Sequence, residues 1–158
     1  MAAESAGILL YRETGDGVEV LLAHPGGPYW ARKDLGAWTI PKGGCDEGEG
    51  LRDCALREMG EELGEAPAIA EDSMLELGSV RQKSGKVVHC WAAEGEFDPA
   101  ALSSNTFSME WPPRSGSEQE FPEIDRAEWF SPDRAREKIL AAQAAFLDRL
   151  LERLGAGG

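Results

Sequence analysis

A group of acidic side chains near the middle of the chain has the spacing of one helical face. Residues 58, 61, 62 and 65 are glutamates, at relative positions i, i+3, i+4 and i+7. Two carboxylates about 5 Å apart repel each other by about 3 kcal/mol at an effective dielectric constant near 20. A hard divalent cation with oxygen ligands removes that repulsion, and carboxylates with water suit Mg²⁺ or Mn²⁺. The spacing therefore favours a metal site on this face, and a solvated acidic helix surface is the alternative.

The segment that carries these acids is predicted to be a helix from about Glu49 to Gly64, where glycine suits a helix C-cap. The six residues before it, 43–48, are too rich in glycine to be helical. Apolar residues recur every four positions and are expected to pack on a sheet: Leu51, Ala55, Met59 and Leu63. The acidic side adjoins this apolar side, so its charges lie where screening by water is weaker.

The same stretch resembles the signature of the Nudix hydrolase family, G-x5-E-x7-R-E-U-x-E-E-x-G-U, in which U is apolar. Eight of its nine defined positions agree: Gly43, Glu49, Arg57, Glu58, Met59, Glu61, Glu62 and Gly64. The ninth differs, because Glu65 stands where the family has an apolar residue. The preceding segment, 38–44, also resembles the usual entry to this motif. The resemblance covers 23 of 158 residues as a motif (43–65), and the order of strands and helices is compatible with the Nudix α/β/α sandwich over nearly all of the chain.

The resemblance implies a metal-dependent hydrolase that cleaves within a phosphoanhydride of a nucleoside diphosphate linked to another group. By position, Glu58, Glu61 and Glu62 are expected to bind Mg²⁺ or Mn²⁺, and the backbone carbonyl of Lys42 to complete the metal shell. Arg57 and Glu49 are expected to orient these acids through a salt bridge, since arginine can hold a carboxylate by a bidentate contact.

A further glutamate outside the motif is expected from the same resemblance. In many relatives it lies about six residues before a tryptophan near the last strand, and Glu123 has this relation to Trp129, with Glu120 in reserve. Phosphoanhydride hydrolysis needs charge neutralisation, an in-line water and a base. Glu58 is the first choice for the base and Glu123 is the second.

Substrate contacts are expected from residues that flank the motif. Lys42 and Arg32 are candidates for phosphate contacts, because they oppose the negative field of the protein, and a solubilising surface charge is the alternative for each. Three aromatic side chains are candidates for stacking on a nucleobase, with burial in the core as the alternative for each: Tyr29, Trp30 and Trp111. Weaker candidates, for which an exposed strand or turn is the alternative, are Arg81, Lys83 and His89.

The substrate is less well determined than the chemistry. The entry Trp-x-x-Pro-Lys-Gly at residues 38–43 resembles that of diadenosine polyphosphate hydrolases, so a dinucleoside polyphosphate such as diadenosine tetraphosphate is the first choice. The alternatives are a nucleoside triphosphate pyrophosphohydrolase, including one for oxidised nucleotides, an RNA 5′-pyrophosphohydrolase, and a catalytically silent Nudix-fold nucleotide sensor. The last is disfavoured because the motif acids are present.

Composition limits the partners of the chain. The net charge of −13 argues against long nucleic acid and anionic membranes as partners. There is no apolar run of the roughly 20 residues that span a bilayer and no signal-peptide pattern, so a cytoplasmic protein is expected. The three cysteines have no CxxC spacing, so reduced thiols are expected rather than a disulfide or zinc site. The sequence gives no prediction of the oligomeric state.

The remaining pattern predicts one α/β domain over residues 1–158, with helices on both faces of a mixed sheet. Strands are expected at 6–12, 18–24, 37–40, 74–82, 86–94, 105–111 and 127–130, with a polar loop at 112–119. A C-terminal helix is expected at about 131–154, with Ser131 as N-cap and Pro132 in the first turn.

Overall fold

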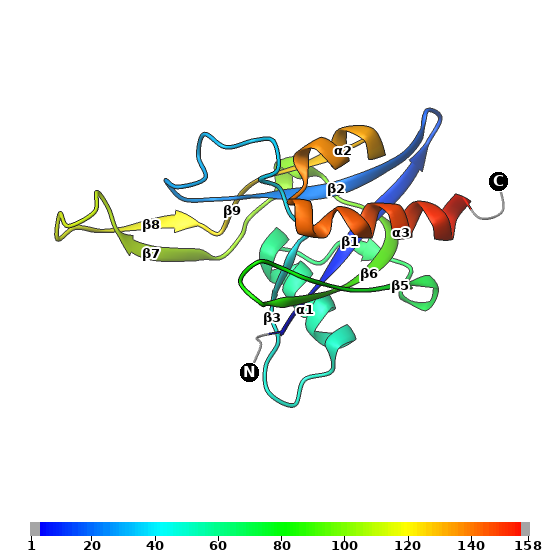
Figure 1. The fold of residues 1–158 in the computed structure, drawn as a ribbon, viewed down its shortest axis with the longest axis horizontal. Helices are drawn as coiled ribbons and strands as arrows, with labels where there is room; N and C mark the ends of the chain where they lie inside the picture. Colours follow the sequence, from blue (N-terminus) through cyan, green and yellow to red (C-terminus); the bar gives the residue numbers. More distant parts are fainter. Residues whose placement is uncertain (1–3, 156–158) are drawn as a thin grey trace.

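The computed structural model describes residues 4–155, which form a mixed β-sheet with helices on both faces (Figure 1). The main path of the sheet runs β4 (Ala68–Ile69), β6 (Val87–Glu96), β1 (Glu4–Thr14), β2 (Gly17–Pro25) and β9 (Ile124–Phe130). Two strands pair beside this path, β3 (Lys42–Gly44) with β1 and β5 (Leu75–Arg81) with β6. Strands β1 and β6 are parallel and the other pairs are antiparallel, so the predicted mixed sheet is confirmed.

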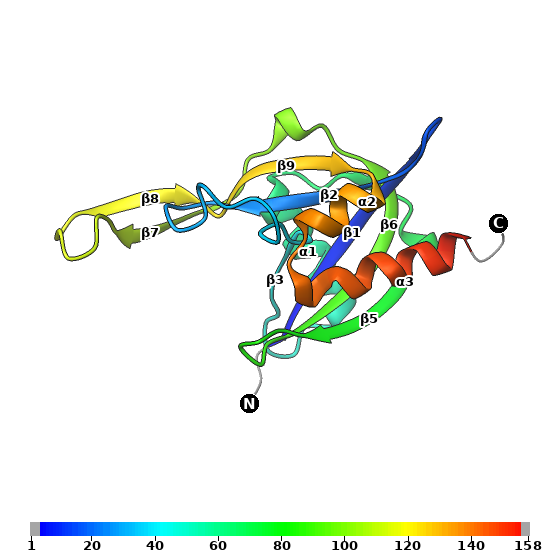
Figure 2. The ribbon, with the colours of Figure 1, turned by 45° about the horizontal axis from the view of Figure 1, so that its top comes forward.

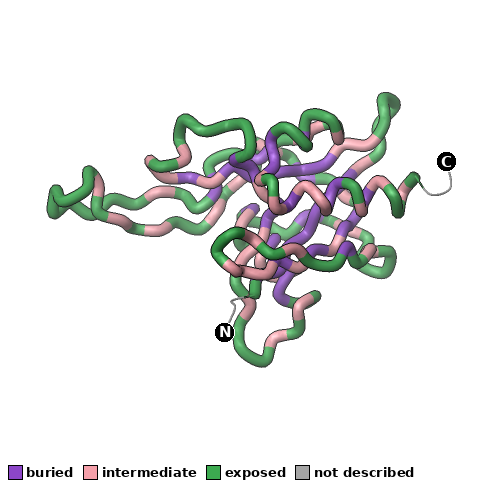
Figure 3. Tube along the Cα trace, viewed as in Figure 1, coloured by how far each residue is buried: buried purple, intermediate pink, exposed green. Residues whose placement is uncertain are grey.

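The alternation of apolar side chains along β1 explains the three layers. Leu9 packs into a cluster with Phe146 and Leu147 of α3 (Ala144–Gly155), on the side where α2 (Pro132–Lys138) also lies. Ile8 packs on the opposite face with Ala55 and Met59 of α1 (Leu51–Leu63). Successive residues of a strand point to opposite faces, so one strand contributes to both cores. The buried residues accordingly gather in the middle of the molecule (Figure 3). Helices α1 and α3 lie on opposite sides of the sheet (Figure 2), which confirms the α/β/α sandwich.

The acidic helix α1 forms close to its predicted bounds. It begins after Gly50, two residues later than expected, and ends at Gly64, whose φ of 89° gives the left-handed cap that favours glycine. Ala55, Met59 and Leu63 are buried, and Leu51 is half-buried. Glu65 follows the end of the helix and lies at a different depression, which Arg12 and Trp129 also line. The expectation that Glu65 extends the acidic face was therefore wrong, because the helix stops before it.

The prediction of a single C-terminal helix at 131–154 was also wrong. The structure has α2, then an extended Ile139 and Leu140, a 3₁₀ helix at Ala141–Gln143, and α3. The break has a tertiary cause, because Leu140 N donates to Trp38 O at 2.8 Å and Ile139 forms a parallel bridge with Trp38. No helix within residues 4–155 is long and apolar enough to cross a membrane.

A two-stranded hairpin projects from the body of the molecule. It consists of β7 (Thr106–Glu110) and β8 (Glu118–Pro122), which pair with each other in a separate sheet (Figure 1). The strand expected at 105–111 is confirmed, but the loop expected at 112–119 ends two residues earlier, because β8 begins at Glu118. The segment 37–40 forms isolated bridges instead of the expected strand. Short 3₁₀ helices at Glu71–Ser73 and Pro99–Ala101 complete the connections.

Two of the three cysteines form a disulfide, which corrects the expectation of reduced thiols. Cys45 and Cys54 are nine residues apart in sequence, and their Cα atoms are 5.4 Å apart. The loop after β3 folds back along the first turn of α1, and a pattern in sequence alone does not reveal this approach. Cys90 is a free, buried thiol.

Candidate active site

The acidic face of α1 and strand β3 form one wall each of a polar pocket of about 470 Å³. The pocket brings together the residues that the motif predicted and several from distant segments. Its lining consists of Lys42, Gly43, Gly44, Arg57, Glu58, Glu61, Glu62, Lys86, Asn105 and Glu123. Antiparallel pairing of β3 with β1 fixes Lys42 and Gly43 opposite Gly7 and Ala6. The sheet therefore determines the distance between the β3 backbone and the helix.

Gly43 is required by the close approach of this strand to α1. A Cβ atom at residue 43 would overlap the carboxylate of Glu58, whereas a Cβ at Gly44 would meet nothing within 4 Å. The absence of a side chain at Gly43 thus leaves room for the Glu58 carboxylate.

Arg57 donates hydrogen bonds to three glutamates and one backbone carbonyl at the pocket. Its Nε and Nη2 donate to the two oxygens of Glu49, at 2.8 and 2.9 Å. Its Nη1 donates to Glu58 Oε1 at 2.9 Å and to Glu61 Oε2 at 2.6 Å, and Nη2 also donates to Gly44 O at 3.1 Å. The Arg57 hydrogen bond and the Asp46 backbone amide lower the pKa of Glu49 to about 2. The expected salt bridge between Arg57 and Glu49 is present, and Arg57 also contacts Glu58 and Glu61.

Glu62 is the acid that these contacts leave without a partner. Its Oε2 atom is buried and has no hydrogen-bond partner among residues 4–155. Burial, followed by the nearby Glu123 and Glu58 carboxylates, raises the pKa of Glu62 to about 8. Burial also lowers the pKa of Lys42, with a further contribution from Lys86, although the nearby acids act in the opposite direction. An orphaned buried carboxylate oxygen beside other acids is the chemical setting that a hard cation suits.

The carboxylates of this pocket are not arranged to coordinate one metal ion together. Within residues 4–155, no three His, Cys, Asp or Glu side chains are grouped so that they could hold an ion as they stand. In this structure Glu58 and Glu61 instead share the Arg57 guanidinium. Oxygen donors and the orphaned Glu62 oxygen nevertheless fit Mg²⁺ or Mn²⁺, with Glu58, Glu61 and Glu62 as the residues that would hold it.

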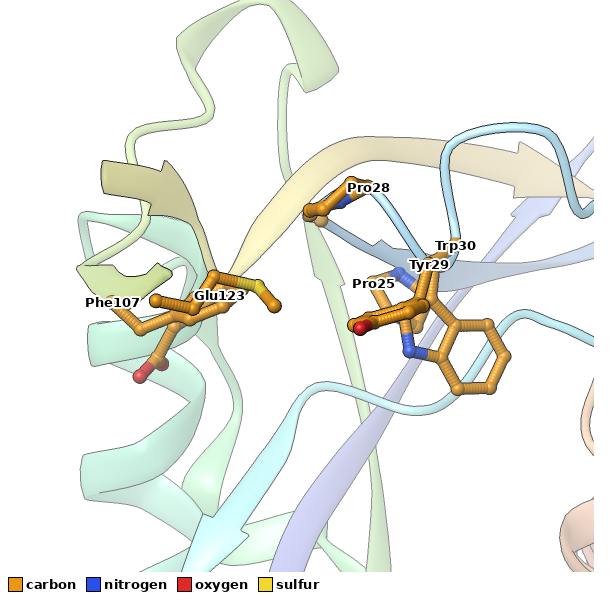
Figure 4. A pocket seen from close by; sticks show the side chains of 9 residues that line it. Pro25, Pro28, Tyr29, Trp30, Phe107 and Glu123 are labelled. Carbon is orange, nitrogen blue, oxygen red and sulfur yellow. The ribbon is translucent and has the colours of Figure 1, made fainter. Parts of the chain in front are cut away.

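A second pocket of about 460 Å³ adjoins the first and shares Glu123 with it. Apolar and aromatic residues line it: Pro25, Gly26, Gly27, Pro28, Tyr29, Trp30, Phe107 and Met109. The close view shows Tyr29 and Trp30 on one side, and Phe107 and Glu123 on the other (Figure 4). The loop after β2 and the base of the β7–β8 hairpin thus form its two walls.

The other predicted substrate residues are placed differently. Trp111 packs edge to face on Tyr29, with ring centroids 5.3 Å apart, and supports that side chain. Arg32 is exposed on the loop after Trp30, and Arg81 donates to Gly85 O at 3.2 Å. Both residues lie outside the set that lines the two pockets.

The weaker candidates also lie elsewhere. Lys83 is exposed, and His89 Nε2 lies 3.3 Å from Glu4 Oε1. Glu120 accepts a hydrogen bond from Thr106 Oγ1 at 2.8 Å and is also outside the acidic pocket.

Outside the motif and the loop after β2, four lining residues were not predicted: Lys86, Asn105, Phe107 and Met109. Lys86 belongs to a basic group with Arg81 and Lys83, and that grouping was the signal for it. Nothing local marked the other three, because the projecting hairpin and its first residues meet the loop after β2 only in the folded chain.

Comparison with known proteins identifies the class. The family model of the NUDIX domain matches residues 1–151, so the chain belongs to the Nudix family and is a Nudix hydrolase. It is 32% identical over 126 residues to an RNA pyrophosphohydrolase of Gluconobacter oxydans (strain 621H), covering 75% of this chain and 70% of that protein. A similar protein of Erythrobacter litoralis (strain HTCC2594), also an RNA pyrophosphohydrolase, is 46% identical over 39 residues, which is 25% of this chain and 24% of that protein.

Solved structures show the same fold. The chain resembles the Ap4A hydrolase of C. elegans in a binary complex, with a TM-score of 0.64, 25% identity and coverage of 98% of this chain and 99% of that chain. The NUDIX domain of NrtR from Shewanella oneidensis, complexed with ADP ribose, has a TM-score of 0.65 at 19% identity, with coverage of 98% and 89%. At that identity the similarity indicates the fold alone.

Proposed function

We propose that this Nudix hydrolase uses a divalent metal to cleave a phosphoanhydride bond in a dinucleoside polyphosphate such as diadenosine tetraphosphate. The observation that carries the proposal is the junction of two unlike pockets at Glu123. The polar pocket offers carboxylates and two lysines, which suit a metal-bound polyphosphate. The adjoining pocket offers aromatic faces, which suit a nucleobase.

The phosphate chain is proposed to lie in the polar pocket. The protein carries a net charge of −13, so an anionic chain needs local positive groups to enter. Lys42 and Lys86 line the polar pocket and supply them. A bound Mg²⁺ or Mn²⁺ would neutralise phosphate charge and acidify a water molecule. Glu58, Glu61 and Glu62 would hold it.

The base is proposed to be Glu58, with Glu123 as the second choice. In this reaction a water oxygen bonds to phosphorus, its proton passes to a carboxylate, and the bond from phosphorus to the bridging oxygen breaks, so the second phosphate leaves. Glu58 has a position fixed by Arg57, and burial, with the nearby acids Glu61 and Glu123, raises its pKa despite the Arg57 contact. A raised pKa makes a carboxylate a better proton acceptor near neutral pH.

The nucleoside is proposed to lie against Tyr29 and Trp30. Tyr29 is 58% exposed and its ring packs at 80° to that of Trp111, so part of the Tyr29 ring is open to a ligand. Phe107 and Met109 close the opposite wall. The likeness to the C. elegans Ap4A hydrolase, at 25% identity over nearly the full length of both chains, supports the same substrate class.

The second candidate is hydrolysis of the 5′-terminal triphosphate of RNA. It is favoured by the two relatives that are RNA pyrophosphohydrolases, one of them 32% identical over 126 residues. The net charge of −13 opposes it, because a long polyanion needs extended positive surface.

A substrate panel with Mg²⁺ and Mn²⁺, read by the identity of the products, separates these functions. Release of ATP and AMP from diadenosine tetraphosphate would support the first proposal. Pyrophosphate released from triphosphorylated RNA, with slow turnover of diadenosine tetraphosphate, would support the second. Monophosphate and pyrophosphate from nucleoside triphosphates would indicate a triphosphate pyrophosphohydrolase. Tight nucleotide binding without turnover of any of these would indicate a sensor and overturn both.

A further inference from the structure

We propose that His24 is a positioning residue that sets the width of the nucleoside pocket by tying the loop after β2 to strand β9. This role rests on the proposed function, because it assumes that the pocket between Tyr29, Trp30 and Phe107 receives the nucleoside. His24 lies at the end of β2 and does not itself line either pocket.

Both ring nitrogens of His24 are engaged although the side chain is fully buried. Nδ1 lies 2.7 Å from Asp125 Oδ1 on β9, and Nε2 lies 2.6 Å from the carbonyl oxygen of Lys33 on the loop. The ring also packs edge to face on Trp38, with centroids 5.1 Å apart. The imidazole is therefore a rigid bridge between two segments that are 92 residues apart in sequence (33 and 125).

Both partners of the imidazole are oxygen atoms from different segments. A carbonyl oxygen only accepts, so Nε2 donates to Lys33 O. Nδ1 faces the Asp125 carboxylate. The two contacts therefore leave through opposite ring nitrogens, and a shorter polar side chain cannot make both of them.

Each end of the bridge leads directly to a wall of the pocket. Lys33 N donates to Trp30 O at 2.9 Å, and Trp30 N donates to Gly27 O at 3.3 Å, so two turns connect the anchored carbonyl to the aromatic wall. Asp125 is two residues after Glu123, which lines both pockets and lies beside Phe107 on the opposite wall (Figure 4). Gly26 N donates to Glu123 O at 2.9 Å, so the loop is fixed at its first residue and again at Lys33. Between these anchors the loop carries Tyr29 and Trp30.

Two variants each keep one of the two hydrogen bonds of His24 and remove the other. The amide nitrogen of asparagine takes the place of Nδ1, so His24→Asn keeps a donor for Asp125 and releases Lys33. The amide nitrogen of glutamine reaches the place of Nε2, so His24→Gln keeps the donor for Lys33. If the hydrogen bond from His24 to Lys33 O sets the width of the pocket, His24→Asn should weaken nucleoside binding more than His24→Gln does. Leu35→Ala is the control, because Leu35 is 71% exposed on the same loop.

Calorimetry with two probes tests the proposal. One probe is the β,γ-methylene analogue of ATP, which has a nucleoside, and the other is inorganic tripolyphosphate, which has none. Each probe is titrated into the protein in the presence of Mg²⁺. In His24→Asn, the Kd of the analogue should rise about tenfold, equivalent to about 1.4 kcal/mol, and that of tripolyphosphate should stay within twofold. His24→Gln should recover most of the loss, and Leu35→Ala should match the wild type.

The outcomes separate this inference from the proposed function. Equal losses for both probes in His24→Asn, or no loss for either, would overturn the positioning role, even if the enzyme cleaves diadenosine tetraphosphate. Equal damage in the Asn and Gln variants would overturn it too, since it would indicate a general packing role. Failure of the wild type to bind the nucleotide analogue more tightly than tripolyphosphate would overturn the nucleoside pocket itself. Thermal melting of each variant sets a temperature at which all are folded.

Discussion

Arg57 binds Glu49 through a bidentate contact, with Nε donating to Oε2 at 2.8 Å and Nη2 to Oε1 at 2.9 Å. Glu49 belongs to the glycine-rich loop and Arg57 to the middle of α1, so the contact fixes the loop to the helix. The remaining donors of Arg57 hold Glu58 and Glu61. One guanidinium therefore orders the loop and two of the acids proposed to hold the metal.

Replacing Arg57 with lysine is expected to lower kcat by tenfold or more. Lysine keeps the charge but lacks the planar fork that makes both contacts to Glu49. Steady-state kinetics on diadenosine tetraphosphate would measure the effect, with Arg52→Lys as the matched control, since Arg52 lies on the exposed side of the same helix and donates to Glu71 O. Equal activity of the two variants would contradict the role of Arg57.

Gly43→Ala is expected to reduce turnover far more than Gly44→Ala. An added Cβ at residue 43 overlaps the Glu58 carboxylate and must displace it, whereas at residue 44 it enters open space. A loss of 10²-fold in kcat is expected at 43, because a displacement of about 1 Å in a catalytic group has an effect of that size. A similar kcat in both variants would show that the position of Glu58 is not critical.

The stability of the metal-free protein is expected to fall as the pH rises from about 4.5 to 8. The pKa of Glu62 is raised from 4.5 to about 8 in the folded chain, so over this range the native state binds a proton that the unfolded state has released. The penalty is complete above pH 8 and absent below pH 4.5. Its size is on the order of a few kcal/mol.

Urea unfolding at pH 5.5 and pH 8.5 in EDTA tests this dependence. Glu62→Gln removes the titrating group and should flatten the difference between the two pH values, while Mg²⁺ should restore stability to the wild type at high pH. A pH dependence that is unchanged in Glu62→Gln would assign the effect to other groups.

Reduction of the disulfide between Cys45 and Cys54 is expected to destabilise the protein. The crosslink joins the loop after β3 to the first turn of α1, and a short closed loop of this kind contributes about 2–3 kcal/mol through the unfolded state. The measurement is the thermal midpoint with and without dithiothreitol. Cys45→Ser should have a lower midpoint that no longer responds to the reductant. A wild-type midpoint that is the same under both conditions would argue against the crosslink in solution.

The motif and the layers were predictable because their signals are local. Four-residue apolar spacing defined the buried side of α1, and alternating strands defined the sheet. The break at Ile139 was not predictable, since α2 and α3 read as one helical pattern and only pairing with Trp38 interrupts it. Phe107 and Met109 were missed for the same reason, because a segment about 80 residues away supplies the opposite wall of their pocket. The functional roles of the site residues follow from the motif and stay predictions.

Glu58, Glu61 and Glu62 are proposed to hold a divalent cation that makes hydrolysis possible. The decisive measurement is calorimetric titration of Mn²⁺ into the protein with the β,γ-methylene analogue of ATP present, alongside Glu58→Gln and Glu62→Gln. We expect saturable Mn²⁺ binding in the wild type, binding at least tenfold weaker in each variant, and turnover reduced by orders of magnitude with the fold intact. Absence of Mn²⁺ binding in the wild type, or unchanged binding and turnover in both variants, would contradict this proposal.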